Sequence, residues 1–112
     1  MDKSILTPQE EKALQKFKKG VQKICGSSGW EIRIFGSRAR GEGHGESDVD
    51  VLVLLSELSG VQKVQIWDEA YSVFAQTDIL ISPVVLSYQR YDNLKKRERL
   101  IVQNIEREGF VL

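Results

Sequence analysis

The sequence of 112 residues contains one cysteine, two prolines and no excess of charge of either sign. A single cysteine, Cys25, excludes an internal disulfide and a cysteine-based metal site. The net charge of +0 excludes the broad positive field with which proteins hold long nucleic acids. No apolar run is long enough to span a bilayer, and residues 1–4 do not resemble a signal peptide. We therefore expect a cytoplasmic protein that binds neither membranes nor bulk nucleic acid.

A chain of this length is expected to form one domain, residues 1–112, around a single core. Its first helix is predicted to begin after Thr7, because Pro8 suits the first helical position and Glu10 can complete a capping box. The apolar stripe of this helix recurs at helical spacing and consists of Leu14, Phe17, Val21 and Ile24. A run rich in glycine and serine, residues 26–29, ends the helix.

Three apolar runs predict β-strands at residues 30–35, 48–55 and 78–86. The second run is apolar on both faces and is therefore expected at the centre of the sheet, whereas Pro83 indicates that the third lies partly at an edge. A helix over residues 60–76 is expected to bury a stripe of Val61, Val64, Trp67, Tyr71 and Phe74. The basic C-terminal segment is expected to be helical and to end at Gly109. These elements predict an α/β fold with a small mixed β-sheet and flanking helices.

Three aspartates are expected at one end of this sheet. Asp48 and Asp50 lie two residues apart at the start of a strand, so their side chains point to one face, roughly 6–7 Å apart at the backbone. The helical crossover to the third strand predicts a parallel pair, which brings Asp78 to the same rim, although an acid before a strand can also be a turn residue. Three carboxylates repel one another unless a cation compensates. Oxygen ligands of this kind favour Mg²⁺ or Mn²⁺.

A second feature, Gly36-Ser37, ends the first strand. If that strand runs antiparallel to the second, this turn meets the same rim. Glycine allows close approach of the backbone to a phosphate, and a serine at the start of a turn adds a hydroxyl donor. Metals held by two or three carboxylates, with other positions left to water and substrate, are typical of phosphate chemistry.

The pattern Gly36-Ser37, ten residues, then Asp48-Val49-Asp50 resembles the DNA polymerase β-type nucleotidyltransferase superfamily, and most closely its minimal nucleotidyltransferases. The resemblance implies transfer of a nucleotide from a nucleoside triphosphate with two Mg²⁺ ions, for which Mn²⁺ can substitute. Asp48 and Asp50 would hold both metals. Asp78 would bind the metal on the nucleophile side and could assist deprotonation of the acceptor. Gly36 and Ser37 would hold the β- and γ-phosphates.

Two arginines, Arg38 and Arg40, follow the Gly-Ser turn. We assign Arg38 to nucleotide binding, with the alternative that it neutralises the acidic rim. The glycine-rich run from Gly41 to Gly45 is interpreted as a loop near the nucleotide.

The resemblance also implies a partner. Minimal nucleotidyltransferases typically pair with a small helical HEPN-domain toxin in a hetero-oligomer, and MntA-like antitoxins transfer AMP from ATP to a tyrosine of a HepT-like toxin. This is the leading functional hypothesis by family analogy. Two alternatives stay open: a partner that neutralises its toxin by binding alone, and a nucleotidyltransferase for a small hydroxylated molecule such as an aminoglycoside.

Overall fold

The computed structural model describes residues 6–36, 48–97 and 100–112. The helices are α1 (Pro8–Cys25), α2 (Gly60–Thr77), α3 (Tyr88–Lys96) and α4 (Leu100–Glu108), and the strands are β1 (Trp30–Phe35), β2 (Val49–Leu55), β3 (Ile81–Ser87) and β4 (Phe110–Val111). The strands form one mixed sheet in the order β3-β2-β1-β4. β1 is antiparallel to both of its neighbours, and β2 is parallel to β3. The predicted α/β fold, the strand directions and the edge position of the strand that contains Pro83 are confirmed.

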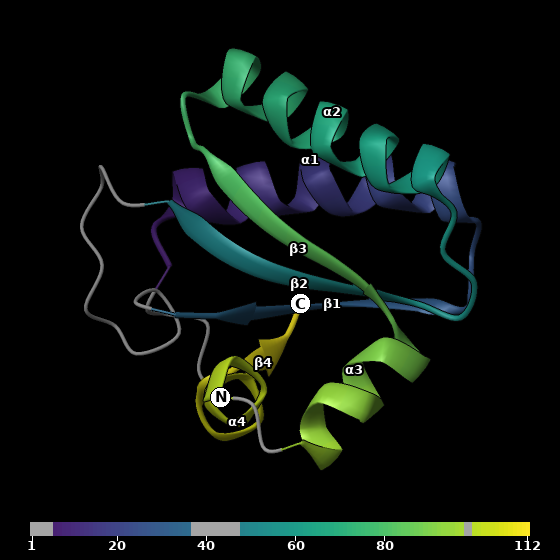
Figure 1. The fold of residues 1–112 in the computed structure, drawn as a ribbon. Helices are drawn as coiled ribbons and strands as arrows, with labels where there is room; N and C mark the ends of the chain where they lie inside the picture. The colour runs from purple at the N-terminus through teal and green to yellow at the C-terminus, as the bar shows by residue number, and fades with distance from the viewer. Residues whose placement is uncertain (1–5, 37–47, 98–99) are drawn as a thin grey trace.

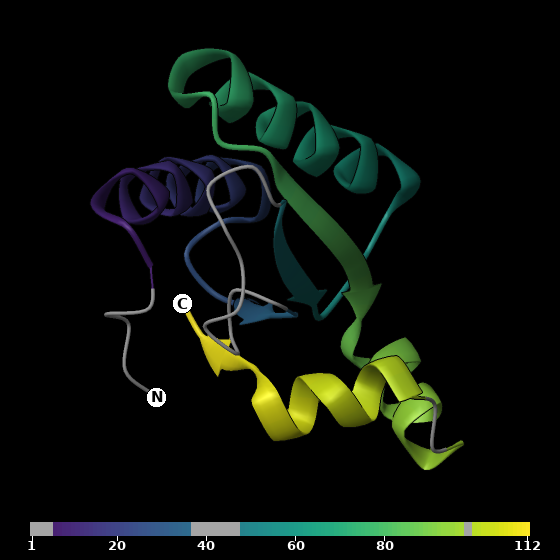
Figure 2. The same ribbon diagram turned by 90° about the vertical axis from the view of Figure 1, so that its left-hand side faces the viewer.

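Helices cover both faces of the sheet (Figures 1 and 2). α1 and α2 lie on one face, and α3 and α4 lie on the other. β2 is buried on both sides because its residues alternate between two cores: Val51 and Val53 pack in the core of α1 and α2, whereas Leu52 and Leu54 pack with Tyr91 of α3. None of the helices in the described part of the chain combines the length and the apolar character that a bilayer crossing demands.

The start of α1 matches the prediction. The Thr7 side chain accepts a hydrogen bond from the backbone N–H of Glu10, at 3.1 Å, and the Glu10 carboxylate accepts one from the backbone N–H of Thr7, at 2.8 Å. Both bonds together form the predicted capping box, which satisfies N–H groups that a helix start leaves without intrahelical partners. Leu14, Phe17 and Val21 of the predicted stripe are fully buried.

The predicted inward face of α2 is wrong. The side chains that α2 contributes to the core are Ile66, Ala70 and Val73. The residues predicted to be buried are largely outside the core: Val61, Val64, Tyr71 and Phe74 are exposed and Trp67 is only partly buried. α2 carries two apolar faces, and helical periodicity alone does not reveal which one meets the sheet.

The C-terminal segment forms two short helices, α3 and α4, followed by β4. Gly109 ends α4 as predicted, and its N–H donates to the Ile105 carbonyl at 2.9 Å. A Cβ at this position would lie 2.6 Å from the Ile105 carbonyl oxygen and 3.0 Å from that of Ile34 in β1. Glycine is therefore needed here because the end of α4 packs backbone against backbone on β1.

A polar network around Glu106 ties α3 and α4 to β1. The Glu106 carboxylate accepts hydrogen bonds from Arg33 and Tyr91, both at 3.0 Å, and from Lys95 at 2.6 Å. The bond from Lys95 lowers the pKa of Glu106 below its usual value. Burial, together with the bond to Glu106, raises the pKa of Tyr91 to about 12.

This network predicts a loss of stability in acid. Because the pKa of Glu106 is lower in the folded than in the unfolded chain, its contribution to stability is present above the unfolded value near 4.5 and is lost as the pH falls through the folded value. We expect Glu106→Gln to melt at a lower temperature at neutral pH and to lose less stability than the wild type on acidification. Thermal melting between neutral pH and pH about 3 measures this. The exposed Glu57 gives the control Glu57→Gln, and an unchanged acid dependence in Glu106→Gln would refute the prediction.

Candidate active site

Three strand ends meet at one end of the sheet, on the left in Figure 1. β1 ends there at Phe35, while β2 and β3 begin there at Val49 and Ile81. Asp48 directly precedes β2, and Asp50 is its second residue. Alternate residues of a strand point to the same face, so Asp48 and Asp50 lie on the face of Leu52 and Leu54. This is the sheet face that α3 and α4 cover. Asp48 is exposed and Asp50 is half-buried.

Gly36 and Asp50 are brought into direct contact. Asp50 is paired with Phe35 across the antiparallel ladder, and Gly36 follows with a φ of +78°. A Cβ on Gly36 would collide with the Oδ2 atom of Asp50. The backbone of the turn after β1 therefore packs against the carboxylate at the start of β2, as the sequence predicted for the two halves of the site.

Asp78 does not take its predicted place. It is the C-cap of α2, with left-handed backbone angles of φ 62° and ψ 15°, and its N–H donates to the Phe74 carbonyl at 2.8 Å. β3 begins only at Ile81, so Asp78 belongs to the turn that leaves α2 rather than to the strand. Within the described residues, no three Asp, Glu, His or Cys side chains form a group that could hold a metal ion. The predicted cluster of three carboxylates is therefore absent from the described structure. Asp78 instead lies in a turn before the strand, which was the alternative interpretation of this residue.

Ser82 occupies the position next to Asp50 that we had expected an acid to fill. It pairs with Asp50 in the parallel ladder and is partly exposed on the same face of the sheet. Ser82 was not predicted at this position because the third strand begins at Ile81 and not, as expected, at Asp78. An aspartate directly after a helical run was the available signal, since Asp tolerates the left-handed conformation that commonly ends helices.

The remaining predicted residues, Ser37 and Arg38, lie outside the described residues, as does the glycine-rich run that follows them. Their assignment to phosphate binding stays a prediction.

The described donors still fit a divalent cation. Mg²⁺ is commonly bound by one or two carboxylates, with water and substrate phosphates completing its octahedron. Asp48 and Asp50 supply two carboxylates on one strand end, and Ser82 adds a hydroxyl oxygen beside them. A third carboxylate is not required for this coordination.

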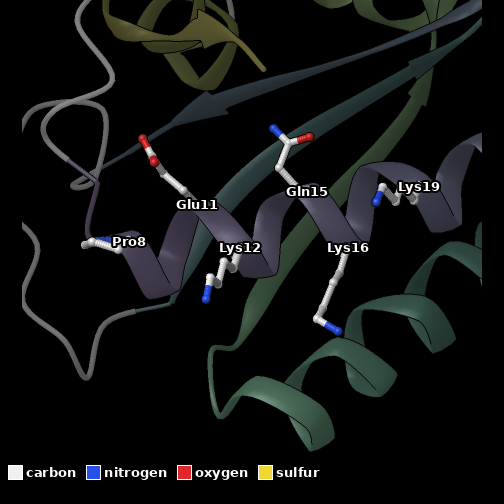
Figure 3. A pocket seen from close by; sticks show the side chains of 6 residues that line it. All are labelled: Pro8, Glu11, Lys12, Gln15, Lys16 and Lys19. Atoms are coloured by element: carbon white, nitrogen blue, oxygen red, sulfur yellow. The ribbon is translucent and has the colours of Figure 1, made fainter.

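A hollow on the surface lies elsewhere and does not suit this chemistry (Figure 3). It has a volume of about 530 Å³ and runs along α1, lined by Pro8, Glu11, Lys12, Gln15, Lys16 and Lys19. Its Lys16 donates to the Gln76 side chain of α2 at 3.3 Å. Because α1 covers the sheet face opposite to Asp50, this hollow is separated from the candidate site by the sheet.

A substitution at Ser82 tests the arrangement of ligands. Ser82→Asp places a third carboxylate beside Asp50, so we expect it to bind Mn²⁺ about tenfold more tightly than the wild type. Asp78→Asn is expected to leave Mn²⁺ affinity unchanged, because Asn also accepts the left-handed conformation of the α2 cap. Isothermal titration with Mn²⁺ measures both, and a marked loss of affinity in Asp78→Asn would restore Asp78 as a ligand.

Comparison with known proteins identifies the family. The model of the nucleotidyltransferase domain family matches residues 14–106. A candidate protein adenylyltransferase of Methanocaldococcus jannaschii is 38% identical over 73 residues, which are 64% of this chain and 74% of the relative.

Solved structures share the fold. A toxin–antitoxin crystal structure with AMP-PNP aligns with a TM-score of 0.58 and 21% identity, covering 87% of this chain and 69% of the other. A variant of the MntA–HpeT toxin–antitoxin aligns with a TM-score of 0.53 and 21% identity, covering 92% and 70%. Together with the family match and the Gly-Ser and Asp-Val-Asp sequence motifs, these findings establish that the chain belongs to the nucleotidyltransferase domain family and is a nucleotidyltransferase.

Proposed function

We propose that this nucleotidyltransferase transfers AMP from ATP to a hydroxyl group of a partner protein. The observation that carries the proposal is the contact between Gly36 and the carboxylate of Asp50, next to Asp48, at one strand end. The relative from Methanocaldococcus jannaschii, named as a candidate protein adenylyltransferase, supports the choice of AMP and of a protein acceptor.

In the proposed reaction, the acceptor hydroxyl oxygen attacks the α-phosphorus of ATP. A bond forms between that oxygen and the α-phosphorus, the bond from the α-phosphorus to the oxygen bridging to the β-phosphate breaks, and pyrophosphate leaves with that oxygen. The hydroxyl proton passes to solvent. Asp48 and Asp50 would hold Mg²⁺, which supplies charge neutralisation at the phosphates and a more acidic acceptor hydroxyl when bound.

The residues of the first turn would position the triphosphate. Gly36, without a side chain, lets the end of β1 approach a phosphate closely. Ser37 would donate its hydroxyl to the β- and γ-phosphates, and Arg38 would add a guanidinium to them. Correct placement of the α-phosphorus relative to the acceptor accounts for much of the rate of such reactions.

For the partner, we propose a helical HEPN-domain toxin that this protein inactivates as an antitoxin. Toxin–antitoxin assemblies are among the structures that share its fold. The acceptor would be a tyrosine of the toxin, because its phenolic hydroxyl ionises more readily than those of serine and threonine.

The test uses the purified protein together with the product of the neighbouring gene, as the candidate toxin. Incubation with ATP and Mg²⁺ should add the mass of one AMP to a toxin tyrosine, as seen by mass spectrometry of toxin peptides. Absence of any adduct would overturn transfer to a toxin, and an adduct on serine or threonine would overturn the tyrosine acceptor. Full protection of toxin-expressing cells by the double variant Asp48→Asn/Asp50→Asn would show that binding alone neutralises the toxin.

A further inference from the structure

The candidate site has two sides, because a different strand flanks β2 on each. On the β1 side, Gly36 packs against the carboxylate of Asp50. On the β3 side, Ser82 is the ladder partner of Asp50. Neighbouring strands lie about 4.8 Å apart, so roughly 10 Å separate the turn at Gly36 from Ser82, with Asp50 between them.

Ser82 is the polar side chain that β3 contributes to this face of the sheet. It points to the same face as its ladder partner Asp50 and is partly exposed. Its hydroxyl forms no hydrogen bond with any residue that the structure describes. Helix α3 follows β3 directly and lies at the other end of that strand (Figure 1). The hydroxyl of Ser82 is therefore available to a molecule that arrives over the start of β3.

The chemistry of the proposed transfer gives each side of the site its own substrate. Displacement at phosphorus keeps the attacking and the leaving oxygen roughly in line, on opposite sides of the phosphorus atom. In the proposed function, the turn after β1 holds the β- and γ-phosphates, and Asp48 and Asp50 hold the cation. Pyrophosphate then leaves on the β1 side, so the attacking oxygen must arrive from the β3 side.

Building on the proposed function, we propose that Ser82 binds the acceptor. Its hydroxyl accepts a hydrogen bond from the acceptor hydroxyl and thereby places the acceptor oxygen in line with the α-phosphorus. The bonds that form and break are those of the proposed reaction. Because the Ser82 hydroxyl is neutral and weakly basic, it orients the acceptor without taking up its proton, which passes to solvent.

The cation does not need Ser82 as a ligand. Mg²⁺ is commonly bound by one or two carboxylates, and water and phosphate oxygens fill its other positions. Asp48 and Asp50 supply two carboxylates at the start of β2. A role toward the acceptor therefore uses the hydroxyl of Ser82, whereas a role toward the cation would only replace a water molecule.

The neighbour of Ser82 on the same face favours a phenolic acceptor. Val84 follows two residues later on β3, roughly 6–7 Å away at the backbone, and is partly exposed. It packs on the apolar cluster that contains Leu52 and Tyr91. A tyrosine whose hydroxyl lies at Ser82 can place its ring against Val84, and aromatic rings gain much from such contact. A sugar hydroxyl lacks this contact.

The first test separates the acceptor from ATP by steady-state kinetics of AMP transfer to the product of the neighbouring gene. Ser82→Ala should raise KM for the acceptor about tenfold, as expected for one lost hydrogen bond, and leave KM for ATP unchanged. Ser82→Thr keeps the hydroxyl on a residue that suits strands and should restore KM for the acceptor. The matched control is Ser28→Ala, at the opposite end of β1, which should behave as the wild type.

Binding of the nucleotide distinguishes the acceptor from the cation. Isothermal titration with Mn²⁺ and a non-hydrolysable ATP analogue should give Ser82→Ala the affinity of the wild type. A tenfold loss of this affinity, with KM for the acceptor unchanged, would make Ser82 a cation ligand and overturn the proposal.

The second test locates the acceptor without turnover. The acceptor tyrosine of the partner is replaced by the photoreactive benzoylphenylalanine, and the sites of cross-linking are mapped by mass spectrometry. Irradiation should join the partner to residues 82–84 of β3. Cross-links to residues 33–36 of β1 instead, or none to β3, would overturn the proposal. If the wild type forms no AMP adduct on any partner, the proposed function fails and this proposal with it, whereas an adduct formed equally well by Ser82→Ala overturns this proposal alone.

Discussion

Asp50→Asn should reduce nucleotidyl transfer by about 1,000-fold or more. The substitution keeps the size of the side chain but removes the negative charge that would hold a divalent cation beside the phosphates, and metal stabilisation of such a transition state amounts to several kcal/mol. The protein should remain folded, because Asp50 is only half-buried and Leu52 and Leu54 carry the packing of the same strand face. Transfer of label from α-labelled ATP, with thermal melting alongside, measures both effects.

The matched control is Asp92→Asn. Asp92 is exposed on α3, where it pairs with Lys96 at 3.1 Å, and exposed pairs of this kind contribute at most about 1 kcal/mol. Asp92→Asn should therefore transfer label at the rate of the wild type. An Asp50→Asn variant that retains more than about a tenth of wild-type transfer would contradict the assignment of Asp50 as a metal ligand.

Gly36→Ala should reduce transfer by about 100-fold, through the position of Asp50 rather than through the fold. A methyl group at Gly36 collides with Asp50 Oδ2, so either the turn or the carboxylate must move. A displacement of about 1 Å in a catalytic group can cost about 100-fold in rate. The left-handed φ of +78° also makes alanine unfavourable here, by about 1–2 kcal/mol.

Gly26→Ala separates these two effects. Gly26 at the end of α1 has a similar φ of +91°, but a Cβ there would meet nothing within 4 Å. Because its backbone angles are also unfavourable for alanine, this variant should lower the melting temperature but leave transfer intact. Equal loss of transfer in both variants would show that the contact between Gly36 and Asp50 has no special role.

Much of the sheet could be predicted because its signals are local. The limits of β1 and the start of α1 follow from turn and capping residues, and the residues of β2 are apolar on both faces because helices cover both. The approach of the turn at Gly36 to Asp50 follows from one topological assumption, an antiparallel first strand, which the structure confirms.

The failures have a different origin. Apolar residues on two sides of α2 give a periodic signal for either side, and only the packed structure shows that Ile66, Ala70 and Val73 face inward. The place of Asp78 depended on where α2 ends. β3 begins at Ile81, three residues later than predicted, and Ser82 rather than Asp78 lies beside Asp50. The Glu106 network joins residues far apart in sequence, so no local pattern reveals it.

The position of the label in the product tests the central claim most directly. The protein and the proposed toxin partner are incubated with Mg²⁺ and with ATP labelled at either the α- or the γ-phosphate. If Asp48 and Asp50 direct transfer of AMP, the α-label should appear on protein and the γ-label should be recovered entirely as pyrophosphate. Transfer of the γ-label to protein, or no transfer of either label, would contradict the account.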